Sequence, residues 1–175
     1  MNKEVEKIRI YGDPVLRKTA EEITAFGKSI TDLKDHLITT LYHAEKGIGL
    51  AAPQIGVSRQ IAVIDISLGK EVDKMVTLIN PVITDAEGEA IEEEGCLSIP
   101  SIYQKVIRAQ KIHVKYLDEK GRKRDMDVEG MIARLIQHEV DHLNGILFID
   151  RIGVVRRALL SKKLRELTKE SGGRE

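Results

Sequence analysis

Apolar residues recur at intervals of three or four in two internal parts of the chain, which is the pattern of an amphipathic helix. In the first part, residues 30–44, the apolar positions are Ile30, Leu33, Leu37, Leu41 and Ala44. The second part runs from Glu129 to Leu143 and stops at Asn144-Gly145, a pair that suits the left-handed residue at a helix end. The pattern predicts two helices that enclose a region of different period.

Between these helices the apolar residues are spaced as in strands. Residues 61–66 form a short apolar run that predicts a buried strand, and residues 75–82, interrupted by Pro81, predict another. The segment GIGLAAPQIG, residues 47–56, breaks the helical pattern with its glycines. We therefore expect a loop between the first helix and the first strand.

Two further strands are predicted before the second helix. Residues 111–117 alternate between apolar and polar side chains, and residues 118–122 have the composition of a hairpin turn. The turn leads into a strand that carries Met126 and Val128. Because strands joined by a hairpin are antiparallel, we expect an α+β fold with antiparallel β-sheets packed around the central helix 129–143.

The end of the chain returns to helical spacing. Residues 151–169 predict a C-terminal amphipathic helix with a basic face, and residues 170–175 are expected to form a flexible tail. The apolar positions of this helix are Ile152, Val155, Leu159, Leu160, Leu164 and Leu167. Since no internal repeat or low-complexity linker divides the chain, we expect residues 1–175 to form a single domain.

Charge and composition exclude several classes of protein. The 28 basic and 28 acidic residues give zero net charge, which argues against a protein built to bind DNA or an anionic membrane. No apolar run approaches the roughly 20 residues that cross a bilayer, and the first residues lack the apolar stretch of a secretory signal. The expected location is therefore the cytoplasm. The single cysteine, Cys96, cannot form an internal disulfide.

The second predicted helix contains an HExxH motif, His138 to His142. Side chains four residues apart project from one face of a helix, so both imidazoles can bind one metal ion while Glu139 lies beside it. Leu135 and Met131 continue the same stripe one and two turns before His138, respectively. They are expected either to fill the core or to line a pocket next to the metal, and the two interpretations are compatible.

A catalytic metal usually has three protein ligands, so two histidines leave one to be found. The metzincin pattern would place a third histidine at Phe148, and Glu166, a second alternative, stands among basic residues. Upstream, EGCLSIP places Cys96 in a segment bounded by glycine and proline, where a thiolate could reach the metal. A metallopeptidase using Glu166 and a structural metal module remain the alternatives.

Three motifs, GIGLAAPQIG, EGCLSIP and QHEVDHLNG, stand in the order and spacing of the signature motifs of peptide deformylases, and YGDPVLR, INPVI and GILFIDRI also resemble this family. The resemblance implies a hydrolase that removes the N-formyl group from newly made proteins. It implies that Cys96, His138 and His142 bind the metal, that Glu139 is the catalytic acid-base, and that Gln54 and the Leu97 amide stabilise the oxyanion. It also implies Fe²⁺ as the native ion, with Zn²⁺, Ni²⁺ or Co²⁺ as replacements.

The same resemblance implies how the substrate is bound. Formyl-methionyl polypeptides would place the methionine side chain against Ile48, Met131 and Leu135, while Gly49 would offer its backbone to the peptide. Tyr103 departs from the family pattern, since many relatives carry a basic residue there. Contacts between this edge of the site and the backbone of the peptide are therefore in doubt.

The resemblance also bears on a supporting ion pair near Cys96 and on contact with the ribosome. The resemblance implies that Glu94 pairs with Arg108 and holds the cysteine segment in shape. In some deformylases a basic C-terminal helix contacts the ribosome, so the basic face of residues 151–169 is a candidate for contact with ribosomal RNA. A solvated basic face is the alternative.

Overall fold

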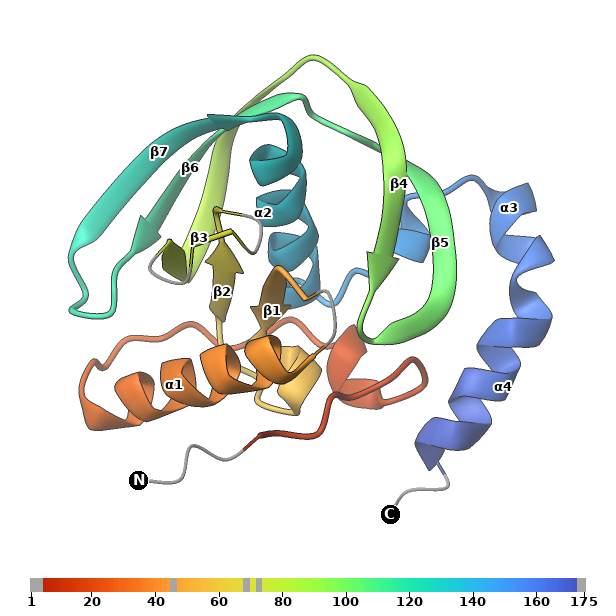
Figure 1. The fold of residues 1–175 in the computed structure, drawn as a ribbon, viewed down its shortest axis with the longest axis horizontal. Helices are drawn as coiled ribbons and strands as arrows, with labels where there is room; N and C mark the ends of the chain where they lie inside the picture. Colours follow the sequence, from red (N-terminus) through yellow and green to blue (C-terminus); the bar gives the residue numbers. More distant parts are fainter. Residues whose placement is uncertain (1–4, 45–46, 68–69, 72–73, 173–175) are drawn as a thin grey trace.

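The computed structural model describes residues 5–44, 47–67, 70–71 and 74–172 (Figure 1). Its strands are β1 (Gly49–Ala51), β2 (Ile61–Asp65), β3 (Met75–Glu87), β4 (Ala90–Cys96), β5 (Ile99–Arg108), β6 (Lys111–Leu117) and β7 (Lys123–Glu129). Its helices are α1 (Lys28–His43), α2 (Gly130–Leu143), α3 (Val154–Leu159) and α4 (Ser161–Gly172). Short 3-10 turns are η1 (Pro14–Arg17), η2 (Ala52–Ile55) and η3 (Phe148–Asp150).

Helix α2 lies between two antiparallel sheets. The larger sheet has the order β1-β2-β3-β6-β7, and the smaller one is the β4–β5 hairpin, which curves over the other side of α2 in Figure 1. Ala133 and Ile136 of α2 pack against the larger sheet through Leu78 and Val114, all fully buried. The predicted α+β fold, with antiparallel sheets around the HExxH helix, is therefore confirmed.

Strand β2 is buried on both faces because a helix covers each of them. Val63 belongs to the apolar cluster that contains Leu37 and Leu41 of α1, whereas Ile64 belongs to the cluster of α2. Side chains at successive strand positions point to opposite faces. This explains why residues 61–64 are all apolar rather than alternating between apolar and polar.

Strand β3 extends beyond residue 82, where the predicted strand ends, and it is irregular at Pro81 as expected. The strand continues to Glu87, and the register against β6 shifts between Ile79 and Val82. Asn80 absorbs the shift with a φ of 48°, and its side chain bonds both the N–H and the carbonyl of Ile23. A bulge thus accommodates the proline where the ladder is already broken.

The predicted loop at residues 47–56 contains regular structure. Strand β1 occupies Gly49–Ala51 and pairs antiparallel with β2, and η2 follows directly. The strand has only three residues, which is too short to produce a periodic pattern in the sequence.

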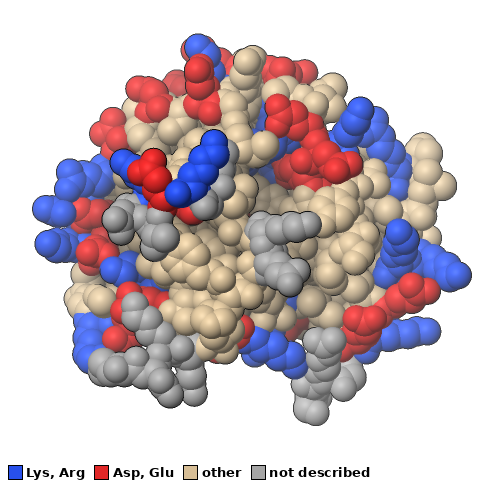
Figure 2. All heavy atoms as spheres, viewed as in Figure 1, with Lys and Arg blue, Asp and Glu red and all other residues tan. Residues whose placement is uncertain are grey.

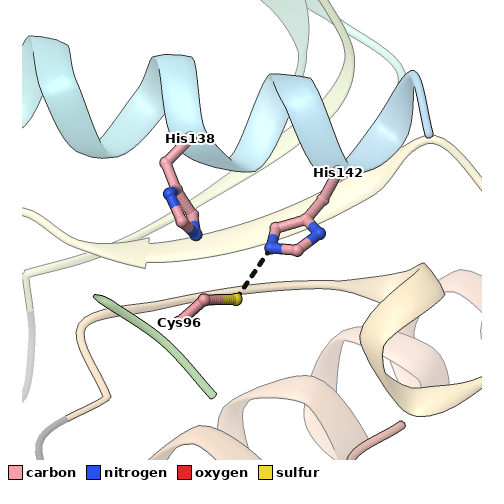
Figure 3. A group of neighbouring side chains, drawn as sticks. All are labelled: Cys96, His138 and His142. Atoms are coloured by element: carbon pink, nitrogen blue, oxygen red, sulfur yellow. Dashed lines mark hydrogen bonds between the residues drawn. The ribbon is translucent and has the colours of Figure 1, made fainter. Parts of the chain in front are cut away.

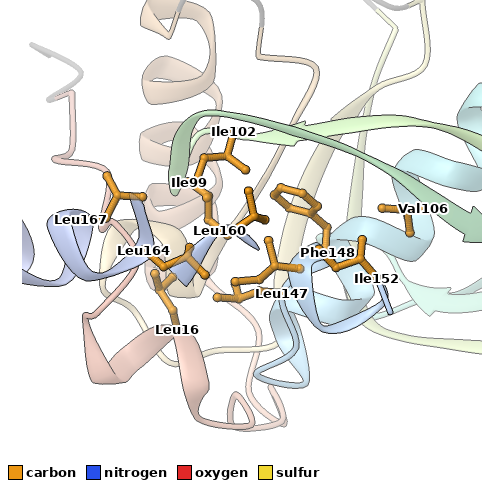
Figure 4. Close-up of a cluster of buried hydrophobic side chains, with 11 residues drawn as sticks. Leu16, Ile99, Ile102, Val106, Leu147, Phe148, Ile152, Leu160, Leu164 and Leu167 are labelled. Carbon is orange, nitrogen blue, oxygen red and sulfur yellow. The ribbon is translucent and has the colours of Figure 1, made fainter. Parts of the chain in front are cut away.

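The β4–β5 hairpin is held by an apolar cluster at its inner face (Figure 4). The cluster joins the hairpin to η1, η3 and the C-terminal helices, and the labelled members are Leu16, Ile99, Ile102, Val106, Leu147, Phe148, Ile152, Leu160, Leu164 and Leu167. Because Leu160, Leu164 and Leu167 of the C-terminal region belong to this cluster, they support the hairpin, whose first strand ends at Cys96.

The C-terminal region differs from the single helix expected over residues 151–169. It forms α3 and α4, joined at Leu160, and α4 continues to Gly172 through part of the predicted tail. Residues 173–175 lie outside the described residues. Val155 and Leu159, assigned to the apolar face, are 76% and 80% exposed, because the joint turns Leu160 rather than Leu159 into the core.

On the face shown in Figure 2, acidic and basic side chains are interspersed around a largely uncharged central region. No helix among the described residues is long and apolar enough to cross a lipid bilayer.

Candidate metal centre and active site

Three side chains that could hold a metal ion, Cys96, His138 and His142, converge between α2 and the end of β4 (Figure 3). Cys96 Sγ, one ring nitrogen of His138 and one ring nitrogen of His142 all lie within 4.8 Å of one another. Cys96 Sγ is 3.1 Å from His142 Nε2. Within the described parts of the chain, this is the one group of three or more His, Cys, Asp or Glu residues with such geometry.

Local structure explains the convergence. The histidines are four residues apart on α2, so both rings leave the helix on one face, toward the hairpin. Cys96 is the last residue of β4, where the pairing with β5 is irregular after Glu94. The Ser98 N–H lies 3.4 Å from Cys96 Sγ, so the turn directs a backbone donor at the sulfur.

The donor set fits a divalent cation. Burial alone would raise the pKa of the Cys96 thiol, but the charge of His142 and hydrogen bonds from both histidines hold that pKa well below its ordinary value. A thiolate with two imidazoles is the kind of set that zinc and related ions bind. In addition, the buried atoms His142 Nδ1 and Glu139 Oε2 have no hydrogen-bond partner among the described residues.

Glu139 lies next to the donors and is 2% exposed. Burial raises the pKa of its carboxyl group to about 7, against the opposing charges of His138 and His142. A carboxyl group with a pKa near neutrality can both accept and return a proton at physiological pH.

Gln54 approaches the site from η2 and is 2% exposed. Its Oε1 accepts the Ala51 N–H at 2.8 Å, which directs its Nε2 toward Cys96 Sγ at 3.6 Å and Ser98 Oγ at 3.2 Å. Leu97, in the turn between β4 and β5, lines the same cavity. The structure therefore places Gln54 in contact with Cys96 and places Leu97 at the wall of the same cavity.

A cavity of about 470 Å³ opens beside Cys96 and His138. The residues predicted to contact substrate, Ile48, Gly49, Met131 and Leu135, all line it, as do His138 and Glu139. Leu135 is buried and Met131 is 44% exposed, so the apolar wall runs from the interior to the rim.

Gly49 is packed closely against α2. A Cβ atom at this position would lie 2.5 Å from Glu139 Oε1 and 2.7 Å from Leu135 Cδ1. The absence of a side chain at this position lets β1 run close to the face of α2 that carries Leu135 and Glu139.

Glu94 and Arg108 pair as expected, and both are buried. Arg108 Nε and Nη2 donate to the two carboxylate oxygens of Glu94 at 2.9 and 3.0 Å. Glu94 Oε2 also lies 3.1 Å from His138 Nδ1, so the carboxylate directly contacts one of the two rings in the candidate metal site. These contacts outweigh the effect of burial and lower the pKa of Glu94 well below its usual range.

Sequence reasoning missed three members of this charged network. Arg108 also donates to Asp141 at 2.5 Å, Arg151 donates to the other oxygen of Asp141 at 2.5 Å, and Arg134 donates to Glu94 at 2.6 Å. The sequence does contain one indication of these contacts. Arg134 and Asp141 are charged residues in a helix whose neighbouring positions predict burial, so each could be expected to need a partner of opposite charge.

Both alternatives for the third ligand lie outside the group. Glu166 is exposed on α4, and Phe148 stacks on His138 with ring centroids 6.2 Å apart. Tyr103, where a basic residue was expected, lies on the cavity rim against Gly95.

An HExxH helix that faces a cysteine hairpin inside an α+β fold defines the class of the protein as a metal-dependent hydrolase. Comparison with known families matches residues 5–158 to the family described as Polypeptide deformylase. The peptide deformylase of Acidobacterium capsulatum is 46% identical over 157 residues, which cover 90% of this chain and 92% of that protein. That of Thermotoga maritima is 43% identical, covering 93% of this chain and 96% of that protein.

Solved structures agree with these relatives. The peptide deformylase of Thermus thermophilus superposes with a TM-score of 0.88 at 42% identity, covering 95% of this chain and 99% of that chain. The chain belongs to the polypeptide deformylase family. Its reaction is the removal of the N-formyl group from newly synthesised proteins, and the family is metal-dependent.

Proposed function

We propose that Cys96, His138 and His142 hold the divalent cation of this deformylase and that Glu139 and Gln54 act on the formyl group. One observation carries the proposal: a thiol and two imidazoles from separate elements converge beside a buried carboxyl group at the wall of an apolar cavity. When bound, the cation supplies Lewis acidity, which makes water a sufficient nucleophile near pH 7.

Glu139 is proposed to move the proton. Its carboxylate form accepts a proton from the attacking water, and the resulting acid returns that proton to the amine that leaves. The pKa of about 7 suits both directions of transfer. The bond that breaks joins the formyl carbon to the methionine nitrogen, and the products are formate and a free N-terminus.

Gln54 and Leu97 are proposed to stabilise the charge that develops on the formyl oxygen. Gln54 Nε2 is fixed by the Ala51 contact before substrate arrives, so no reorientation is needed during the reaction. Preorganised donors of this kind are typically worth about 10²–10³-fold in rate. The backbone N–H of Leu97 would be the second donor.

The cavity is proposed to bind the N-terminal formylmethionine of nascent polypeptides. Ile48, Met131 and Leu135 present an apolar wall beside the metal-binding group, which suits an unbranched thioether side chain. Gly49, with no side chain in the way, would pair its backbone with the extended peptide.

Formate release from formyl-Met-Ala-Ser tests these roles. Wild-type protein should release formate, whereas Cys96→Ser should bind the cation weakly and lose most of its turnover. Cleavage of an unformylated peptide by wild type, undiminished in Cys96→Ser and abolished in Glu166→Gln, would instead support a metallopeptidase with a Glu166 ligand.

We propose Fe²⁺ as the native ion, with Zn²⁺, Ni²⁺ and Co²⁺ as replacements, because a thiolate–imidazole set accepts all of them. Oxygen attacks both ferrous iron and an accessible thiolate. Anaerobically purified protein should therefore contain iron and lose activity in air, while protein reloaded with Ni²⁺ should keep its activity longer. Equal air stability of the two forms would contradict the assignment.

We propose a cytoplasmic location and contact between the basic face of α3–α4 and ribosomal RNA. Seven basic residues between 151 and 169 support an electrostatic contact that weakens with salt. A charge-reversal variant such as Lys162→Glu/Lys163→Glu should co-sediment with ribosomes less than wild type at low salt. Equal co-sedimentation would count against the contact, and fractionation of cells tests the location.

A further inference from the structure

Arg134 is a buried charged residue that the catalytic roles above do not use. It stands on α2 one turn before His138, and its side chain is 5% exposed. Its Nη1 donates to Glu94 Oε1 at 2.6 Å and to the carbonyl of Val106 at 3.0 Å. Its Nη2 donates to the carbonyl of Ala90 at 2.7 Å.

These acceptors lie on both strands of the β4–β5 hairpin. Ala90 begins β4, Glu94 is two residues before Cys96, and Val106 is near the end of β5. The guanidinium is rigid and planar, so three simultaneous contacts fix the hairpin relative to α2. Arg134 thus joins the element that supplies the thiolate to the element that supplies both imidazoles.

The contact with Glu94 reaches His138. The same carboxylate that accepts from Arg134 through Oε1 lies 3.1 Å from His138 Nδ1 through Oε2. An acceptor behind the ring fixes both the tautomer and the orientation of a metal-binding histidine. Arg108 holds Glu94 as well, but its remaining donor is directed to Asp141 rather than to the hairpin backbone.

The two histidines are supported unequally. His142 Nδ1 has no hydrogen-bond partner among the described residues, whereas His138 Nδ1 has the buried carboxylate. Of the two rings, only His138 therefore has a hydrogen bond at Nδ1 among the described residues. The orientation of that ring depends on the position of Glu94.

We propose that Arg134 is a positioning residue for the metal centre, which holds Glu94 against His138 and the β4–β5 hairpin against α2. The proposal rests on the metal-binding role assigned to Cys96, His138 and His142. Arg134 contacts none of these three residues in the interactions above and acts through Glu94 and the hairpin backbone.

Arg134→Lys is the decisive variant, because lysine keeps the charge but cannot contact Glu94, Ala90 and Val106 together. The probe is Co²⁺, with its affinity measured by chelator competition and its ligand-field absorption recorded. We expect the Kd for Co²⁺ to rise about 10- to 100-fold, with shifted absorption bands. The kcat for formyl-Met-Ala-Ser should fall while KM stays near the wild-type value.

Glu92→Gln is the matched control. Glu92 forms the outer ion pair of Arg134 at 3.4 Å but is half-exposed and does not contact Glu94 in the network described. This variant should keep the wild-type Kd for Co²⁺ within about twofold and the same absorption bands, since a solvent-exposed partner contributes little.

Folded Arg134→Lys with wild-type Co²⁺ affinity and absorption would overturn the proposal, even if its melting temperature were lower. The double variant with Glu94→Gln gives an independent criterion: if Arg134 acts through Glu94, the two effects on Kd are less than multiplicative, and fully multiplicative effects contradict it. Should Arg134→Lys not fold, wild-type affinity in Glu94→Gln overturns the route through Glu94.

A wrong assignment of the metal ligands would give a different result from a wrong role for Arg134. In that case Cys96→Ser would bind Co²⁺ with the affinity of the wild type.

Discussion

Glu139 shows how burial, rather than a special partner, can set the chemistry of one residue. Its carboxyl group is almost completely buried, and desolvation disfavours the charged form more than the nearby histidines favour it. Glu94 is also buried, at 6% exposed, but His138 and Arg108 shift its pKa the other way. The two buried glutamates therefore have opposite pKa shifts, because Glu94 is hydrogen-bonded to Arg108 and His138, whereas the histidine charges near Glu139 do not offset its burial.

Glu139→Gln removes the group that moves the proton but keeps the size and polarity of the side chain. We expect kcat to fall by about 10²–10⁴-fold, the usual contribution of general acid–base catalysis, with metal content unchanged. Formate release and metal analysis of the same preparation measure both quantities. A variant that loses its metal, or one that keeps more than a tenth of wild-type kcat, would contradict the role.

Gln54→Ala tests the oxyanion donor. Nε2 of Gln54 contacts Ser98 and Cys96 from a buried position, so removal of the amide should lower kcat about 10²–10³-fold with little change in KM. The control is Ser98→Ala, which removes the neighbouring hydroxyl but keeps the amide. If Ser98→Ala were as inactive as Gln54→Ala, packing around Cys96 rather than the amide donor would explain both.

At the scale of elements, the ends of α2 determine where its histidines lie. Gly130 begins the helix with a φ of 62°, and Gly145, two residues after its end, has a φ of 72°. A Cβ atom on Gly145 would lie 2.7 Å from the carbonyl oxygen of Arg17, while one on Gly130 would meet no atom within 4 Å. The C-terminal end of α2 is thus fixed against η1, whereas its first residue is not confined by packing.

This difference predicts unequal effects of alanine at the two glycines. Gly130→Ala adds only backbone strain, of order 1 kcal/mol, whereas Gly145→Ala adds both strain and a clash with backbone atoms. Urea unfolding should show a larger loss of the free energy of unfolding for Gly145→Ala, by at least about 1 kcal/mol. Equal losses would mean that the contact with Arg17 relaxes at no cost.

Elements with a regular period could be predicted from the sequence, and the β4–β5 hairpin could not. Periodicity indicates α1, α2, β2 and β6 because each packs one face, or both, on a continuous apolar core. In β4, by contrast, three consecutive glutamates hide the strand, and Glu94 is buried only because arginines from β5 and α2 pair with it. In β5, Ser101 with a φ of 61° interrupts the alternation.

The residues of the candidate site could be predicted from the sequence for a different reason. HExxH fixes two donors through the geometry of a single helix, and the lone cysteine has a chemistry that few other residues share. The pairs Arg134–Glu94 and Arg151–Asp141 depend on how separate elements meet, which no local pattern encodes.

For the whole molecule, Asp150 connects the beginning and the end of the chain. It accepts hydrogen bonds from Arg17 of η1, Arg157 of α3 and the Leu147 N–H. Burial alone would raise the pKa of Asp150, but the Arg17 and Leu147 hydrogen bonds and the charges of both arginines lower it below its ordinary value. The charged form is therefore favoured by folding.

Because the folded pKa is lowered, the stabilisation from Asp150 is fully present above the unfolded pKa of about 3.9 and is lost as pH falls through the folded value. Asp150→Asn should therefore be less stable than wild type at pH 7, and the difference should shrink below about pH 4. Urea unfolding at pH 7, 4 and 3 measures it. A difference that stays constant over this range would show that the charge of Asp150 does not contribute.

The metal itself should act on the stability of the whole molecule, because its proposed ligands come from the hairpin and from α2, which belong to different apolar clusters. A cation that binds only the folded state stabilises it by about 2.7 kcal/mol when present at 100 times its Kd. Chelation should therefore abolish formate release and lower the melting temperature, and added Co²⁺ or Ni²⁺ should restore both. Cys96→Ser should melt at nearly the same temperature with and without chelator, since it lacks the thiolate that joins the hairpin to the helix. If wild type lost activity on chelation without any change in melting temperature, the cation would not connect these two elements.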